Sequence, residues 1–319
     1  MKKLLVAALG LLCALGAAAQ QSWPDKPVRL IVPFAPGGTT DIAARLLGER
    51  LSQAWRQPVL IENRSGAGGS LGAAEAARAA PDGYTLLFPS GSVMTVNQHV
   101  YQSPGYDPIK DFVPITSVVS GAQVIVVSAK GPYKDMRGLI EAARAQPGRL
   151  TFGHAGIATQ THLAGENLLY QAKVELVSVP FKGEAPAMAA LIAGDIDLVP
   201  ANIAAALPHI QSGRLRALGV TSLAEAPQLP GVPPVAAAVP GFENVGWWGL
   251  VAPAGTPHAV VTKVYTDTKK ALEATELKER LFAQGLTTVG NTPQEFARTI
   301  KEETALWAKV VRERKISVK

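Results

Sequence analysis

Short apolar runs alternate with amphipathic stretches along the first two thirds of the chain. Each run spans four to six residues, and a turn containing glycine or serine and then a helical pattern usually follow it. Strands that alternate with helices in this way predict right-handed βαβ units and parallel sheets, and therefore an α/β fold. The expected strands are 28–32, 59–63, 84–88, 150–153, 174–179, 196–199 and 216–220.

Two segments depart from this alternation. Residues 112–130 are extended, with two apolar runs separated by Ser-Gly-Ala, whereas residues 223–257 are rich in proline and glycine and show too little periodicity for regular structure. About 300 residues also exceed one comfortable hydrophobic core. We therefore expect two lobes, the first formed by residues 21–121 together with 228–319 and the second by residues 122–227.

The N-terminus has the pattern of an export signal. Lys2 and Lys3 precede a short apolar run, and three alanines at 17–19 provide a cleavage site. The run is short for a membrane span, so a membrane anchor is the weaker alternative. We expect residues 1–20 to be a cleaved signal peptide that sends the protein to the periplasm. Cleavage removes Cys13 and leaves a chain without disulfides or a thiol nucleophile.

The loop PFAPGGTTD at residues 33–41 connects the first expected strand to a helix. Gly37 and Gly38 permit a tight turn, and Thr39 and Thr40 fall at the helix start. Unpaired N–H groups there favour an anion, so the loop can hold a carboxylate or phosphate without a cationic side chain. The alternative is an ordinary strand-to-helix turn.

Enzymatic, nucleotide, metal and nucleic-acid chemistry find little support. The glycine-rich loop 65–72 does not fit G-x-G-x-x-G, and no G-K-[ST] follows it. The five histidines are scattered, and no G-x-S-x-G elbow appears. The basic tail at 309–319 lacks interleaved aromatics, and loss of Lys2 and Lys3 lowers the net charge from +6 to +4. We expect a binding protein rather than an enzyme, with no cofactor, no metal and no nucleic-acid partner; a hydrolase is a more distant possibility.

Polar side chains recur where the expected strands end. Taken singly, each is more often a helix cap or turn residue than a ligand contact. Their shared position along the carboxyl ends of strands in both halves favours binding. These residues are Thr39, Thr40, Ser65, Ser90 and Ser92 in the first half, and Thr159, Gln160, Thr161, Lys182 and Asn202 in the second.

Several long motifs occur in a fixed order, among them WPDKPVRLIVPFAPGGTTD, APDGYTLLF, VPFKGEAPAMAALIAGDIDL and WWGLVAPAGTP. Through them the whole mature chain resembles the periplasmic solute-binding proteins of the tripartite tricarboxylate transporter family, the Bug receptors. The resemblance implies a two-lobed periplasmic binding protein fold of type II kind, a Venus flytrap with the ligand cleft between the lobes.

The same resemblance implies a function. The protein is expected to capture a small carboxylate-containing solute, such as a di- or tricarboxylate, an acidic amino acid or an aromatic acid. It would act as a monomer and deliver this solute to the membrane subunits of a tripartite tricarboxylate transporter. The alternative is a periplasmic sensing module that hands its ligand to the ectodomain of a sensor kinase.

The resemblance further implies that backbone amides and waters, rather than an arginine, hold the ligand carboxylate. Two members of the implied site have competing interpretations. Asp41 can instead stabilise a helix dipole. His154 and Pro200 both depart from the usual family pattern, and His154 either lines the cleft or caps a strand end. The expected ligand-binding residues are Phe34, Ala35, Gly38, Thr39, Asp41, Ser90, Ser92, His154, Thr159, Gln160, Thr161, Lys182, Gly183, Ala185 and Asn202.

Overall fold

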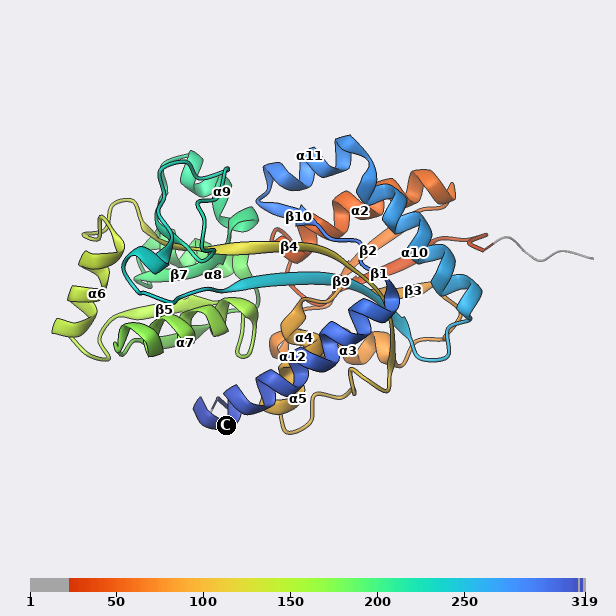
Figure 1. Ribbon diagram of the computed structural model, residues 1–319, viewed down its shortest axis with the longest axis horizontal. Helices are drawn as coiled ribbons and strands as arrows, with labels where there is room; N and C mark the ends of the chain where they lie inside the picture. The colour runs from red at the N-terminus through yellow and green to blue at the C-terminus, as the bar shows by residue number, and fades with distance from the viewer. Residues whose placement is uncertain (1–22, 315, 318–319) are drawn as a thin grey trace, which may run out of the picture.

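The computed structural model describes residues 23–314 and 316–317, so the expected signal peptide at residues 1–20 lies outside the described residues. Two lobes lie side by side, and two long strands run from one to the other (Figure 1). Both lobes combine a sheet with surrounding helices, which confirms the predicted two-lobed α/β fold. None of the helices in the described part is both long and apolar enough to cross a bilayer.

The first lobe is built on a mixed sheet. Its parallel part has β1 (Val28–Val32) between β2 (Val59–Asn63) and β3 (Thr85–Leu87). β9 (Val245–Pro253) and β10 (Leu286–Thr288) each pair antiparallel with β4 (Phe112–Ser128), and β9 also pairs antiparallel with β3. The helices of this lobe are η1 (Ala67–Gly69), α2 (Thr39–Trp55), α3 (Ser70–Ala77), α4 (Gly91–Thr95), α5 (Asn97–Val100), α10 (His258–Glu273), α11 (Thr275–Ala283) and α12 (Pro293–Arg314).

The second lobe repeats the strand-to-helix pattern. β5 (Thr151–His154) lies parallel to β6 (Val177–Pro180) and β7 (Leu198–Asn202). β7 and β8 (Leu215–Val220) each pair antiparallel with the second part of β4. The helices of this lobe are α6 (Met136–Ala145), α7 (Gln160–Ala172), α8 (Glu184–Ala193), α9 (Ile203–Gln211) and η2 (Val235–Ala237).

β4 belongs to both sheets. Its register with β9 extends to the pair Ala122 and Val245, and its register with β7 begins at the pair Gln123 and Asn202. The chain therefore passes from the first lobe to the second within one uninterrupted strand, although the sequence shows two apolar runs separated by Ser-Gly-Ala. Figure 1 shows β4 and β9 as the two long ribbons between the lobes.

The return crossing comes later in the chain than the boundary expected at residue 228. Residues 228–244 pack against the second lobe, where Val235 and Phe242 belong to its buried core. A bridge between Val220 and Pro234 also ties this segment to β8. The chain returns to the first lobe at β9, because apolar side chains in the proline-rich segment complete the second core.

The expectation that residues 223–257 lack regular structure is wrong for β9. Every residue of this strand except Val245 is buried, and Trp248 is among the largest fully buried side chains. A strand covered on both faces loses the alternation of apolar and polar residues. The flanking prolines and glycines then make such a run look like a loop.

Candidate functional site

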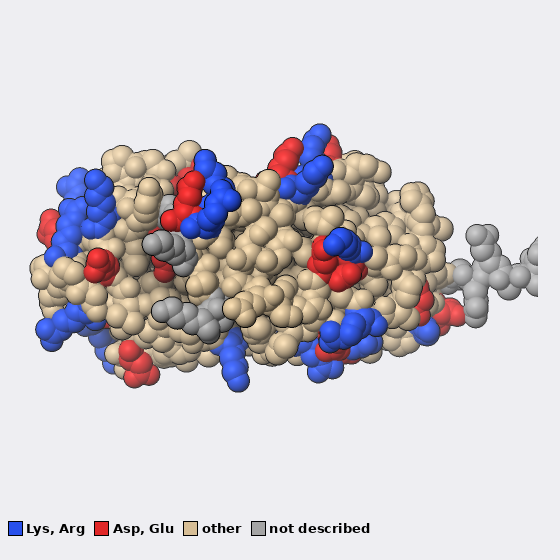
Figure 2. Space-filling view, turned by 90° about the horizontal axis from the view of Figure 1, so that it is seen from below, with Lys and Arg blue, Asp and Glu red and all other residues tan. Residues whose placement is uncertain are grey.

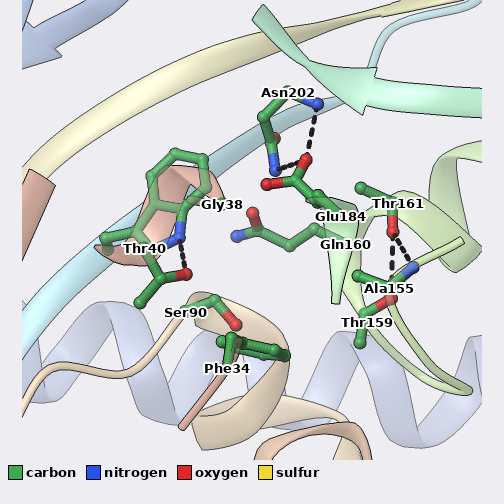
Figure 3. A pocket seen from close by; sticks show the side chains of 11 residues that line it. Phe34, Gly38, Thr40, Ser90, Ala155, Thr159, Gln160, Thr161, Glu184 and Asn202 are labelled. Carbon is green, nitrogen blue, oxygen red and sulfur yellow. Dashed lines mark hydrogen bonds between the residues drawn. The ribbon is translucent and has the colours of Figure 1, made fainter. Parts of the chain in front are cut away.

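A cavity lies between the two lobes at the carboxyl ends of their parallel strands. About 320 Å³ of space lies between its walls, a volume that includes the solvent at its open side. The strand-to-helix connections after β1, β3, β5, β6 and β7 all contribute to its wall, and we call it the inner cavity (Figure 3). It is lined by Phe34, Gly38, Thr40, Ser90, Ala155, Thr159, Gln160, Thr161, Glu184, Asn202 and Trp248.

Glu184 joins the two lobes across this cavity. Its Oε2 accepts a hydrogen bond of 3.0 Å from the backbone N–H of Thr39, at the start of α2. Its Oε1 accepts from the backbone N–H and the side-chain amide of Asn202, at 2.9 and 2.8 Å. Burial raises the pKa of Glu184 above its ordinary value, although the hydrogen bonds from Thr39 and Asn202 act in the opposite direction. The helix terminus expected to bind an external anion thus already binds a carboxylate of the protein.

The threonines of the second lobe shape the loop that opens α7. Thr159 caps this helix, since its hydroxyl accepts from the His162 N–H and donates to the Gly156 carbonyl at 2.7 Å. Thr161 accepts from the Ala155 N–H at 3.0 Å, and the two hydroxyl oxygens lie 3.1 Å apart. The hydroxyls therefore hold the loop so that the first turn of α7 faces the inner cavity.

Two histidines support the same loop from behind. The N–H of Gly156 donates to Nδ1 of His154, and the N–H of Ala158 donates to Nδ1 of His162, both at 3.2 Å. Since Nδ1 of His154 accepts, its Nε2 carries the proton and donates to the Ser178 hydroxyl at 2.8 Å. Burial, with a contribution from the neighbouring His162, lowers the pKa of His154 to about 3. His154 is fully buried and is absent from the lining of the inner cavity.

The first lobe supplies a more apolar wall. Phe34 and Trp248 line it, and the indole Nε1 of Trp248 donates to the Thr40 hydroxyl at 2.9 Å. Ser90 lies between Thr40 and Phe34 in Figure 3, and its hydroxyl oxygen is 3.1 Å from that of Ser92. Ser92 itself lines an adjoining cavity, together with Gln160.

Asp41 stabilises the first loop from inside. It accepts hydrogen bonds of 3.0 Å from the Gly37 N–H, 3.0 Å from Asn63 and 2.9 Å from Arg45. Burial alone would raise the pKa of Asp41, but these hydrogen bonds and the Arg45 charge hold it below its ordinary value. Asp41 does not line the inner cavity, and its interactions fix the conformation of the turn before α2.

A second, outer cavity lies where the lobes meet further along the cleft. Phe34 and Ala155 line both cavities, and the exposed Lys182 lines only the outer one. The Tyr101 hydroxyl donates to the Ile157 carbonyl at 3.0 Å and so links the two lobes beside it.

Gly183 and Ala185 lie where the lobes touch. A Cβ atom at Gly183 would lie 3.0 Å from Cβ of Ala35, and a Cβ atom at Gly37 would lie 3.7 Å from Cβ of Ala185. Gly183 also has a φ of +134°, which few other residues adopt. These residues determine how closely the lobes approach each other.

The protein matches a known family. The model of the tripartite tricarboxylate transporter family receptor matches residues 43–316. The chain belongs to this family. Receptors of this family are periplasmic solute-binding proteins, which confirms the resemblance seen in the motifs.

Individual relatives resemble most of the chain. Protein BugT of Bordetella pertussis is 35% identical over 315 residues, which cover 97% of this chain and 97% of BugT. Rpa4515 from R. palustris, whose structure was solved with adipate, is 34% identical in sequence, with a TM-score of 0.90. The match covers 93% of this chain and 100% of the Rpa4515 chain. MatC from Rhodopseudomonas palustris with bound malate is 32% identical, with a TM-score of 0.86, and covers 91% of this chain and 100% of its own.

In this receptor the structure brings part of the expected site together. The expected residues that line the inner cavity are Phe34, Gly38, Ser90, Thr159, Gln160, Thr161 and Asn202. Those that lie beside it are Ala35, Thr39, Asp41, Ser92, His154, Lys182, Gly183 and Ala185.

Glu184 and Trp248 line the cavity of the receptor and were not among the expected site residues. Glu184 has the sequence position of an ordinary acid in the first turn of a helix. Trp248 falls in the segment that appeared irregular. Across the described residues, His, Cys, Asp and Glu form no group of three or more that could hold a metal ion.

Proposed function

We propose that this receptor captures a small carboxylate-bearing solute in the inner cavity and delivers it to the membrane subunits of a tripartite tricarboxylate-type transporter. The observation that carries the proposal is the start of α7 in the cavity wall, where Thr159, Gln160 and Thr161 meet. The first N–H groups of a helix have no partner inside the helix, and the dipole there favours an anion.

The charge distribution supports recognition by such local donors. On the face shown in Figure 2, lysines and arginines lie in small groups with aspartates and glutamates, separated by wide uncharged stretches. No lysine or arginine is among the described residues that line the inner cavity. Backbone amides therefore supply the positive potential for a bound carboxylate. The structures of Rpa4515 with adipate and MatC with malate, which share this fold, support a carboxylate as the ligand.

A thermal-shift screen of the mature protein tests the proposal. The panel contains di- and tricarboxylates, acidic amino acids and aromatic acids, each paired with the compound in which primary amides replace all of its carboxylates. A ligand at about 100 times its dissociation constant should add roughly 2.7 kcal/mol of apparent stability. At least one acid should stabilise the protein, and its amide should do so much less. Equal stabilisation by acid and amide, or by no acid at all, would contradict carboxylate binding.

A further inference from the structure

The inner cavity has an unbalanced set of polar groups around Glu184. Among the described residues that line it, Glu184 is the one ionisable side chain. It is 7% exposed and lies between Asn202 and Gln160 in Figure 3. The cavity wall thus contains a buried carboxylate for which no lining side chain supplies a counter-charge.

The neighbours of Glu184 present further acceptors. The amide nitrogen of Asn202 donates to Oε1 of Glu184 at 2.8 Å. The oxygen Oδ1 of Asn202, a residue that is 5% exposed, is then left buried without a partner. The amide nitrogen of Gln160 donates to the Trp247 carbonyl at 3.0 Å, so its Oε1 is likewise buried and unpaired. Buried acceptors of this kind are stabilised when a ligand brings donors to them.

Two of the helix termini at the cavity, those of α2 and α7, are in different states. Glu184 already accepts from the first turn of α2, so this terminus has its anion. The first turn of α7, at Gln160 and Thr161, belongs to the cavity wall. A ligand carboxylate is therefore held best at α7, and the part of the ligand that reaches Glu184 has to be a donor. A second carboxylate at that place would meet a like charge in a buried site.

We propose that the receptor selects an amino acid, whose carboxylate lies at the start of α7 and whose protonated amino group donates to Glu184. The proposal rests on the function proposed above, because it takes the inner cavity as the carboxylate site. It makes Glu184 the residue that distinguishes amino acids from simple diacids. The ligand ammonium supplies the counter-charge that the cavity wall lacks.

Calorimetric titration of the mature protein with matched pairs tests the ligand class. Each pair has the same methylene chain, with an ammonium in place of one carboxylate: β-alanine and succinate, 4-aminobutyrate and glutarate, 5-aminopentanoate and adipate. The protein amino acids, each with its deaminated acid, extend the series. In the pair that binds best, the amino acid should bind at least tenfold more tightly.

The outcomes separate the two proposals. If carboxylates without an amino group bind as tightly as their amino counterparts or more tightly, the amino-acid proposal fails and the carboxylate site stands. If no carboxylate of either kind binds, the function proposed above fails with it.

Glu184→Gln tests the residue, with Glu175→Gln as the control, because Glu175 is an exposed acid of the same lobe. Glu184→Gln should weaken amino-acid binding at least tenfold and leave diacid binding unchanged or stronger, whereas the control should bind as the wild type does. An equal loss for amino acids and diacids would show a merely structural role and overturn the assignment. Melting curves verify folding, and the matched pairs on the wild-type protein decide the ligand class even if this variant does not fold.

Discussion

Two loops face each other across the inner cavity, and each ends at the amino terminus of a helix. In the loop before α2, Glu184 from the opposite lobe accepts from the Thr39 N–H. In the loop before α7, threonine hydroxyls and two histidine rings bind the loop itself, and the first turn belongs to the cavity wall. In both loops the first N–H groups of a helix and its dipole favour an anion. The difference teaches that tertiary contacts decide whether the anion comes from the protein or from a ligand.

The largest effect is expected at the first loop. A Cβ atom at Gly38 would lie 3.4 Å from Oε2 of Glu184, and the backbone there, with φ of −85°, accepts a side chain without strain. The added methyl groups of Gly38→Val should push Glu184 away from Thr39 while the fold remains intact. Ligand affinity should fall tenfold to hundredfold, since hydrogen bonds to charged groups are worth about 1.5–3 kcal/mol.

Titration and melting of the same sample measure both consequences of Gly38→Val. The matched control is Gly138→Ala in α6, where a Cβ atom would have no neighbour closer than 3.6 Å. Normal binding by Gly38→Val would mean that the first loop and Glu184 do not form part of the site.

The second loop should be sensitive to acid, because it depends on a neutral ring of His154. The pKa of this ring is lowered to about 3 in the folded protein, against an ordinary value near 6.5. Between these values the unfolded chain binds the proton more readily, so the stability contributed at neutral pH is lost as the pH falls from 6.5 toward 3. At roughly 1.4 kcal/mol per pKa unit, the effect amounts to a few kcal/mol.

Urea denaturation over a pH series measures this slope. His154→Asn keeps an acceptor for the Gly156 N–H but cannot titrate, so its stability should fall less steeply in acid than that of the wild type. Identical slopes for the two proteins would contradict a neutral buried His154.

The smallest effects are expected at the threonines of the second loop. Thr159→Ala removes a helix cap and should cost about 0.5–2 kcal/mol of stability. Thr161→Ala leaves the Ala155 N–H without its acceptor and should cost a similar amount. Both changes should also weaken ligand binding, because they loosen the first turn of α7.

Thr292→Ala provides the comparison for these variants. Thr292 accepts from the Glu295 N–H at the start of α12, and it does not line the inner cavity. The variant Thr292→Ala should therefore lower the melting temperature to a similar degree without changing the affinity for the ligand. Unchanged affinity in both Thr159→Ala and Thr161→Ala would exclude these threonines from the site.

The parts of the fold that follow local rules could be predicted from the sequence. The strand 28–32, the turn with Gly37 and Gly38 and the helix after it depend on neighbouring residues, and they occur as expected. β9 was missed because burial on both faces removes the alternation that identifies a strand. The same cause hid Trp248, which lines the cavity from that strand.

Glu184 shows a different limit of sequence reasoning. It is separated from Thr39 by 145 positions, and no local pattern indicates that the two helix starts meet. An acid in the first turn of a helix is normally explained by the helix dipole, so its role as a contact between lobes has no sequence signal of its own. His154 is similar, because only the packed structure shows that its ring accepts from the Gly156 N–H and lies outside the lining of the inner cavity.

The passage of β4 through both sheets has a consequence for how the protein unfolds. Its hydrogen bonds join it to β9 and β10 in the first lobe and to β7 and β8 in the second. Melting of either lobe removes the partners from half of this strand and weakens the ladder of the other half. The strand that joins the lobes therefore also couples their folding, and the amide protons along β4 should be among the last to exchange with solvent.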